Sequence, residues 1–190
     1  DEYAMLALYD DVEAFPQWLH MIDEANLITE RSLSDRDMRF TIRLPWPLND
    51  REVLLTSKLV QVVTEEEESV TAYLEGDADL APLDEDFVRV PELSGVFRFQ
   101  RVAPLEVEAT YQISADLGGY LPMWIVNFAF RDIPYFTLEK MRRIVVRDEY
   151  QAQYFADLDL MGPGRPADLP PALSYINNSG IPAETDSETP

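Results

Sequence analysis

The sequence predicts an α+β fold in which a curved antiparallel β-sheet wraps around one long C-terminal helix. Two observations predict this class: apolar and polar residues alternate through much of residues 36–113, and the apolar spacing becomes helical after Gly118 and Gly119. The chain of 190 residues is 46% hydrophobic, which is enough to bury the core of one domain. A helix laid across a curved sheet leaves space between the two, so we expect a ligand cavity there.

The start of the chain predicts two short helices. Good helix formers with helical spacing run from Glu2 to Leu8, and the pair Phe15-Pro16 then interrupts them. Pro16 suits the first turn of a second short helix, which carries Trp18.

The middle of the chain predicts an antiparallel meander. Residues 36–44 place Met38, Phe40, Ile42 and Leu44 on one face and polar residues on the other, as in a half-buried strand. The same alternation predicts further strands at Val53–Val63, Val70–Glu75, Val96–Val102 and Val107–Ile113. The glutamates at 65–68 indicate a solvated turn, and they lack the spacing of a Ca²⁺ loop. The proline-containing segment Ala81–Leu93 indicates a long loop.

The last third of the chain divides into a helix and a tail. A helical pattern runs from Pro122 to about Leu158, with a break expected at Pro134 and a buried stripe formed by Leu138, Met141, Ile144 and Val145. Residues 162–190 hold six of the 14 prolines and three of the seven glycines. We therefore expect a folded unit over residues 1–161 and a flexible acidic tail over residues 162–190.

Charge and missing residue types exclude several functions. The 36 acidic and 15 basic residues give a net charge of −21, so we expect no nucleic-acid partner and little attraction to anionic membranes. The absence of cysteine excludes disulfides and thiol nucleophiles, and His20 is the single histidine. No G-x-S-x-G motif is present, so we expect no catalytic residue, metal or cofactor. No apolar run is long enough to span a membrane, and an initial Asp indicates that native residues preceded Asp1.

Three motifs occur together in this chain. They are Leu44-Pro-Trp-Pro-Leu-Asn-Asp-Arg-Glu-Val53, Gly119-Tyr-Leu-Pro-Met-Trp-Ile-Val-Asn-Phe128 and Ile133-Pro-Tyr-Phe-Thr-Leu-Glu-Lys-Met-Arg142. With the segment Leu6–Trp18, they resemble the START (StAR-related lipid transfer) family, the lipid-transfer branch of the helix-grip fold, in a bacterial form. The resemblance covers about Glu2 to Leu158. It implies a helix-grip fold that carries a lipid, without catalysis.

The resemblance lacks one part of the family pattern. START domains carry a long helix and about three strands ahead of the segment that matches Glu2. A sheet without those strands has an open edge and an incomplete cavity wall. Either the chain is a trimmed view of a longer protein, or another element covers that edge. Bacterial cytoplasm and periplasm both remain open as compartments, and so does the oligomeric state.

The candidate ligand-binding residues come from the predicted cavity walls and lid. They are Phe87, Phe97, Arg98, Phe99, Arg101, Ala109, Tyr111, Ile113, Trp124, Phe128 and Met141. Arg98 and Arg101 lie on opposite faces of their strand, so one of them must point inward and needs a carboxylate or a ligand head group. Glu108 and Gln112 are the candidate partners. Trp46 and Pro47 are interpreted as a structural corner, and His20 as a surface or capping residue.

These features favour a lipid carrier over two alternatives. The carrier would hold a sterol, a phospholipid or a fatty-acid-like molecule between sheet and helix, with the segment Ala81–Leu93 and the start of the last helix as a lid. It would make transient contact with membranes. One alternative is an enzyme of the same superfamily, of the aromatase/cyclase or hydrolase type. The other is a sensing or interaction module whose acidic surface takes a basic partner.

Overall fold

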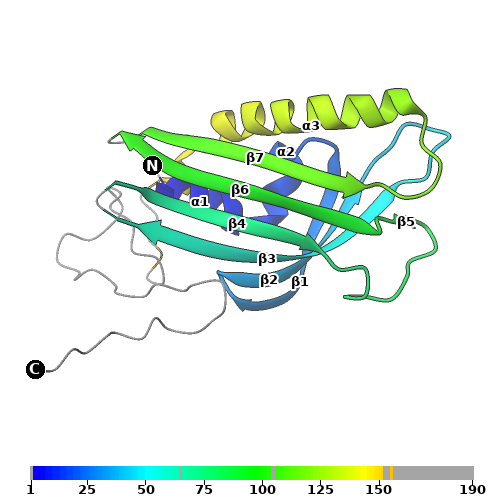
Figure 1. Cartoon of the computed structure of the whole chain (residues 1–190), viewed down its shortest axis with the longest axis horizontal. Coiled ribbons are helices and arrows are strands. Elements are labelled where there is room, and N and C mark those ends of the chain that lie inside the picture. Colours follow the sequence, from blue (N-terminus) through cyan, green and yellow to red (C-terminus); the bar gives the residue numbers. More distant parts are fainter. Residues whose placement is uncertain (1, 65, 104–105, 152–154, 156–190) are drawn as a thin grey trace, which may run out of the picture.

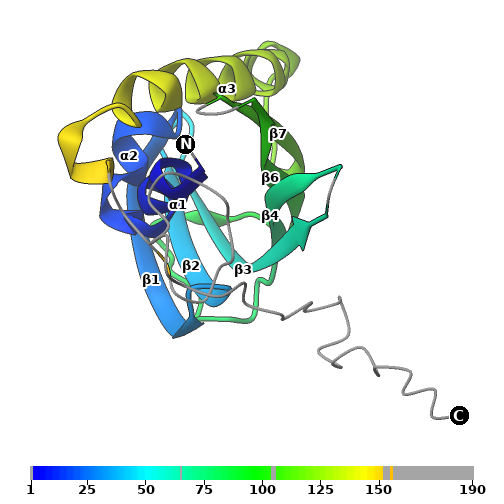
Figure 2. The same ribbon diagram turned by 90° about the vertical axis from the view of Figure 1, so that its left-hand side faces the viewer.

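A curved sheet, two small helical segments and one long helix make up the molecule (Figure 1). The computed structural model describes residues 2–64, 66–103, 106–151 and 155, with the side chains of residues 128 and 129 left aside. The sheet curls around the N-terminal helices, and the long helix lies across its open side, so the view along the sheet shows a nearly closed ring (Figure 2). The predicted α+β helix-grip architecture is confirmed.

The N-terminal helices fill part of the concave side of the sheet. Helix α1 spans Glu2–Asp10, the 3₁₀ turn η1 spans Val12–Ala14, and α2 spans Phe15–Trp18. Every residue of α1 from Glu2 to Tyr9 is buried, because the sheet surrounds this helix on several sides. Both predicted helices are therefore present, and α1 is a core element.

Six long strands form an antiparallel sheet in the order β1-β2-β3-β4-β6-β7. Their bounds are Ile22–Ser32 for β1, Asp35–Ile42 for β2, Arg51–Val63 for β3, Glu68–Gly76 for β4, Glu92–Ala103 for β6 and Glu106–Asp116 for β7. A two-residue strand, β5 (Val88–Arg89), pairs in parallel with the start of β3. Strand β1 was not predicted, because only Ala25 is buried in it and an exposed edge strand has little apolar alternation.

The segment between β4 and β6 lies over the outer face of the sheet. The buried carboxylate of Glu52 in β3 anchors it: Glu52 accepts a bond from Arg89 at 2.7 Å and another from Arg39 of β2 at 2.5 Å. The Arg39 guanidinium in turn lies 5.2 Å from the ring of Phe87. The prediction of a long loop over 81–93 is correct apart from β5 and the first residues of β6.

Helix α3 spans Met123–Ile144 without a break and differs from the prediction at two places. Pro134 lies inside the helix, where the one main-chain bond that it removes is tolerated because the flanking turns pack against α2 and the sheet. The helix also ends at Ile144 instead of near residue 158. A 3₁₀ turn, η2 (Asp148–Tyr150), follows, and the buried Tyr150 donates a hydrogen bond to Asp11 at 2.9 Å. The predicted tail, residues 162–190, lies outside the described residues.

Candidate ligand cavity

A cavity of about 80 Å³ lies between the concave face of the sheet and the first half of α3. Its floor comes from β2, β3, β4, β6 and β7, one side comes from α2 and Tyr9 at the end of α1, and Phe130 and Ile133 of α3 form the roof. No aspartate, glutamate, lysine or arginine lines it in the described part of the chain. The lining of the cavity is therefore uncharged and mostly apolar.

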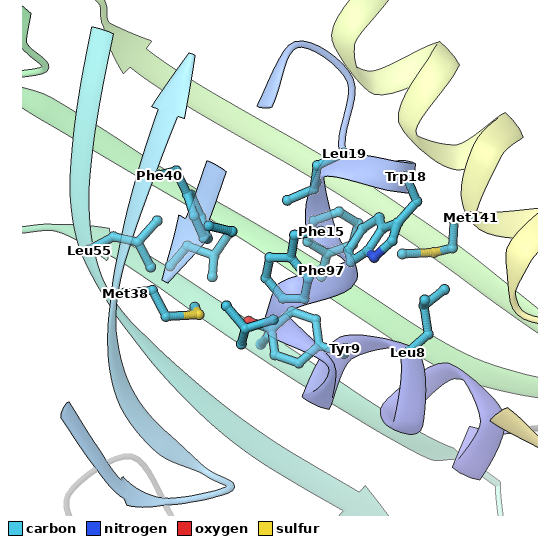
Figure 3. Packing of buried hydrophobic residues seen from close by; sticks show 14 of the residues in the cluster. Leu8, Tyr9, Phe15, Trp18, Leu19, Met38, Phe40, Leu55, Phe97 and Met141 are labelled. Atoms are coloured by element: carbon cyan, nitrogen blue, oxygen red, sulfur yellow. The ribbon is translucent and has the colours of Figure 1, made fainter. Parts of the chain in front are cut away.

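Aromatic rings make up much of the wall. Phe97 of β6 and Tyr111 of β7 are cross-strand partners, and their rings stack at 4.1 Å with an angle of 8° between them. Trp18 meets Phe97 edge-on at 5.7 Å and Phe15 edge-on at 4.9 Å. Figure 3 shows the rings of Phe97, Trp18 and Phe15 close to those of Tyr9 and Phe40. Such tilted contacts fix each ring in place and leave flat apolar faces toward the cavity.

One glycine lies in the sheet between two residues that line the cavity. Gly95 of β6 lies between Leu74 of β4 and Ile113 of β7 in one row across the sheet. A Cβ atom at Gly95 would lie 2.7 Å from the main-chain oxygen of Gln112, a distance that real side chains do not adopt. The strands β6 and β7 approach so closely at this point that only glycine fits.

Two tyrosine hydroxyls supply polar atoms near the cavity. The Tyr9 hydroxyl pairs with the Ser57 hydroxyl of β3 at 2.7 Å, and burial raises the pKa of Tyr9 to about 12. Burial also raises the pKa of Tyr111. Both phenols therefore stay neutral at physiological pH and serve as hydrogen-bonding groups without charge.

His20 lines the cavity, although the sequence indicated a surface or capping residue. Its main-chain N–H donates to Thr137 Oγ1 of α3 at 3.0 Å, and its ring packs against Phe136 at 5.0 Å. Burial and the nearby Lys140 lower the pKa of His20, with Asp132 acting in the opposite direction. The imidazole is therefore mostly neutral at pH 7 and ties the end of α2 to the middle of α3.

The structure brings only some of the predicted site residues to the cavity. Phe97, Tyr111 and Ile113 line it. Phe99 and Met141 are buried in the neighbouring core, and Ala109 shares the inner face of β7 farther along the strand. Trp124 is 64% exposed at the start of α3. Phe87 lies on the outer face of the sheet, and the side chain of Phe128 is outside the described set.

Neither predicted arginine reaches the cavity. Arg101 is on the inner face, but it is held at the far end by Glu2 at 2.6 Å and Glu68 at 2.9 Å. Arg98 points outward and pairs with Glu67 at 2.8 Å. The expected partnership with Glu108 or Gln112 is wrong, because the strand register places both of those residues on the outer face and the acids of the β3–β4 hairpin lie closer.

Two further arginines are buried, and neither was among the predicted site residues. Arg36 is fully buried on the concave face of β2 and pairs with Asp10 at 2.9 Å, with the Leu33 carbonyl as a further acceptor. Arg36 is the first residue of the alternating series that continues with Met38, and this position in the sequence indicates that its side chain points inward. Arg51 is also buried, and burial lowers its pKa. Both cations are neutralised or hydrogen-bonded inside the protein.

Arg51 joins two segments at one end of the cavity. Its guanidinium donates to the carbonyls of Leu117 (3.0 Å) and Gly118 (3.1 Å), which follow β7, and to that of Asn49, which precedes β3. The β2–β3 turn and the β7–α3 linker therefore meet at this end (Figure 1). Gly118 and Gly119 in the linker have φ angles of +68° and +63°, which favour glycine.

Large apolar side chains are exposed around this same end. Trp46 is 92% exposed, Tyr120 86% and Met123 68%. The corner predicted at Trp46 and Pro47 is present as a turn closed by a bond from Leu48 N–H to the Pro45 carbonyl, but the Trp46 indole projects into solvent. An exposed apolar set of this kind is a candidate interaction surface. We call Trp46, Tyr120, Met123 and Trp124 the mouth residues.

The architecture defined by this site is the helix-grip fold of StAR-related lipid transfer domains. A STAR-related lipid transfer protein from Xanthomonas axonopodis superposes with a TM-score of 0.66 at 23% identity, over 76% of this chain and 78% of that one. Human StAR-related lipid transfer protein 5 gives 0.61 at 15% identity, over 74% of this chain and 69% of that one. Human STARD10 gives 0.57 at 19% identity, over 75% and 57%. The resemblance seen in the sequence motifs and the observed fold therefore agree.

One relative is similar in sequence. The chain is 30% identical over 138 residues to the uncharacterized protein PA1579 of Pseudomonas aeruginosa. The match covers 72% of this chain and spans 65% of that protein's length. No family model matches the chain. Within the described residues, no helix has the length and apolar character needed to cross a bilayer.

Proposed function

We propose that this protein binds a lipid in the cavity under α3 and carries it between membranes. The observation that supports this most is the uncharged aromatic cavity, placed where a helix-grip fold separates its long helix from the sheet. Affinity would come mainly from burial of apolar surface, at roughly 25 cal/mol per Å² before the costs of association.

Ligand entry requires the cavity to expand. Its volume of about 80 Å³ is small beside the roughly 300–1,000 Å³ of ordinary ligand sites. The roof is the part best able to move, because Phe130 on the first half of α3 is 45% exposed and two glycines with positive φ precede the helix. We infer that the first half of α3 swings outward to admit the lipid.

Membrane contact would occur at the same end. The mouth residues surround the linker between β7 and α3, about which α3 would open. Tryptophan and tyrosine side chains favour the interface between water and lipid. The net charge of −21 opposes binding to anionic surfaces. We therefore expect a weak, transient preference for vesicles of neutral lipid.

One observation favours an enzyme as the second candidate. His20 lines the cavity with a lowered pKa, and a neutral imidazole is a competent general base. A cyclase- or hydrolase-type reaction would place the reacting atom against that ring. Replacement of His20 by Gln separates the two: a carrier keeps its ligand affinity, whereas such an enzyme loses turnover.

The test is to identify what the protein holds. Native mass spectrometry of the purified chain, followed by extraction, should reveal an intact lipid bound one to one, and titration with a fluorescent sterol and a fluorescent fatty alcohol should show saturable binding. Failure of both probes to bind, together with no co-purified lipid, would contradict the carrier. A chemically altered product would instead support the enzyme.

A further inference from the structure

We propose that the ligand of this cavity is electrically neutral, with a hydroxyl or carbonyl oxygen as its polar group, so that anionic lipids are excluded. The inference rests on the proposed lipid-binding function and adds the chemical class of the ligand. The sequence alone left sterols, phospholipids and fatty acids equally open.

The lining of the cavity carries no fixed charge in the described residues. Every lining side chain in the described residues is apolar, aromatic or the imidazole of His20. Because the pKa of His20 is lowered, that ring carries little positive charge at pH 7. A carboxylate or phosphate that enters this site loses its hydration and gains no counter-charge.

The buried arginines nearby are already paired with carboxylates or hydrogen-bonded to main-chain carbonyls. Arg36 lies behind Tyr9, with its guanidinium 6.0 Å from that ring, and Asp10 neutralises it. Arg101 faces two glutamates at the opposite end of the sheet. Arg51 donates to three carbonyls that hold the linker closed. An anionic head group would have to break one of these arrangements to be compensated.

Besides the imidazole of His20, the polar side-chain groups at the cavity are neutral hydroxyls. The Tyr9–Ser57 pair uses one of its two hydroxyl hydrogens internally, which leaves donor and acceptor capacity on a neutral pair. Tyr111 adds a second phenol beside the stacked ring of Phe97. These groups match an alcohol, a ketone or an ester oxygen, and they hold it without any desolvated charge.

The test compares probes that share one C18 chain and differ in the head group, which is charged only in the acid. A fluorescent C18 fatty acid, its methyl ester and the corresponding fatty alcohol are titrated into the wild-type protein at pH 8, where the acid is ionised. We expect the ester and the alcohol to bind at least 100-fold more tightly than the carboxylate. Equal or tighter binding of the carboxylate would overturn the inference while leaving lipid binding intact. Binding of none of the three probes, nor of a fluorescent sterol, would overturn the proposed function and this inference with it.

Two variants sharpen the result. Leu117→Lys places an ammonium at the cavity edge on a half-buried side chain that can reach solvent, and it should raise carboxylate affinity at least tenfold. Tyr9→Phe removes one hydroxyl and should weaken the alcohol more than the ester. Tyr73→Phe, on the outer face of β4, is the matched control and should change neither. Unchanged carboxylate affinity in Leu117→Lys would contradict the role given to the uncharged lining.

Discussion

The two ends of this molecule are built differently. At the far end, buried side chains are paired with charged groups: Glu2 with Arg101, Arg36 with Asp10, and Tyr150 with Asp11. At the mouth end, tryptophan, tyrosine and methionine side chains stand in solvent around a glycine linker. The same helix reflects both environments, since Met141 in its second half is 1% exposed and Trp124 in its first half is 64% exposed. The second half of α3 is therefore held by buried contacts, whereas its first turn carries exposed apolar side chains, and this is the end at which we propose that the helix opens.

The largest expected effect distinguishes a residue of β7 that lines the cavity from one that does not. Ala115 lines the cavity, whereas Ala109 faces the same side of β7 without lining it. Ala115→Phe should fill the space a lipid would use and reduce ligand affinity more than 100-fold, with little change in Tm. Ala109→Phe should overpack and lose about 1–3 kcal/mol of stability while binding persists. Fluorescent-alcohol titrations beside thermal melts measure both, and equal effects of the two variants would argue that no cavity is used.

A second pair of variants tests the anchored end. Arg101→Met leaves two buried carboxylates without their cation, so we expect a loss of about 3–5 kcal/mol in unfolding free energy. Arg98→Met, on the same strand but with an exposed partner, should lose no more than about 1 kcal/mol. Urea denaturation compares them. Similar losses in both variants would mean that the far end is no more rigidly held than the surface.

A third prediction concerns the mouth. Trp46→Ala combined with Trp124→Ala should slow lipid transfer between neutral vesicles several-fold without changing Tm, because both side chains are exposed and pack little. Val62→Ala combined with Val102→Ala, exposed on strands away from the mouth, is the control. An unchanged transfer rate in the tryptophan variant would remove the membrane-contact proposal and leave ligand binding untouched.

The smallest effect is a pH dependence at the anchored end. Burial raises the pKa of Glu2 above its ordinary value of 4.5, with Arg101 opposing that shift. A raised folded-state pKa means that the contribution of Glu2 to stability is complete below pH 4.5 and is lost as the pH rises through the folded-state value. Glu2→Gln should therefore raise Tm slightly at pH 7 and not below pH 4.5. A lower Tm at pH 7 would show that the ion pair with Arg101 outweighs the burial of the charge.

The sequence predicted the elements that alternate strongly and missed those that do not. Met38, Phe40 and Ile42 identified β2 because one face of that strand is buried, whereas β1 is an exposed edge and shows no such period. Pro134 suggested a break, but tertiary packing carries α3 through it. The motif around Trp46 and Arg51 pointed to the fold without showing that Arg51 holds the linker after β7.

The apolar lining residues of the candidate site could be predicted from the sequence, whereas the positions and partners of the charged side chains could not. Phe97, Tyr111 and Ile113 followed from strand alternation next to a helix-grip cavity. Which arginine faces inward, and whether a ligand or a protein carboxylate compensates it, depends on contacts between residues far apart in sequence, such as Arg101 with Glu2. His20 was placed at the surface because nothing in its neighbours indicates that α3 packs over it.

Hydrogen exchange of the intact protein, with and without a bound fluorescent sterol or fatty alcohol, tests whether a lipid binds under the first half of α3. The ligand should protect amides in the first half of α3, residues 123–133, and at the end of β7, residues 113–117. Amides of α1 and of residues 137–144 should stay equally protected in both states, because that end is already closed. Protection spread evenly over the chain, or confined to the outer face of the sheet, would contradict a lipid held under a helix that opens at one end.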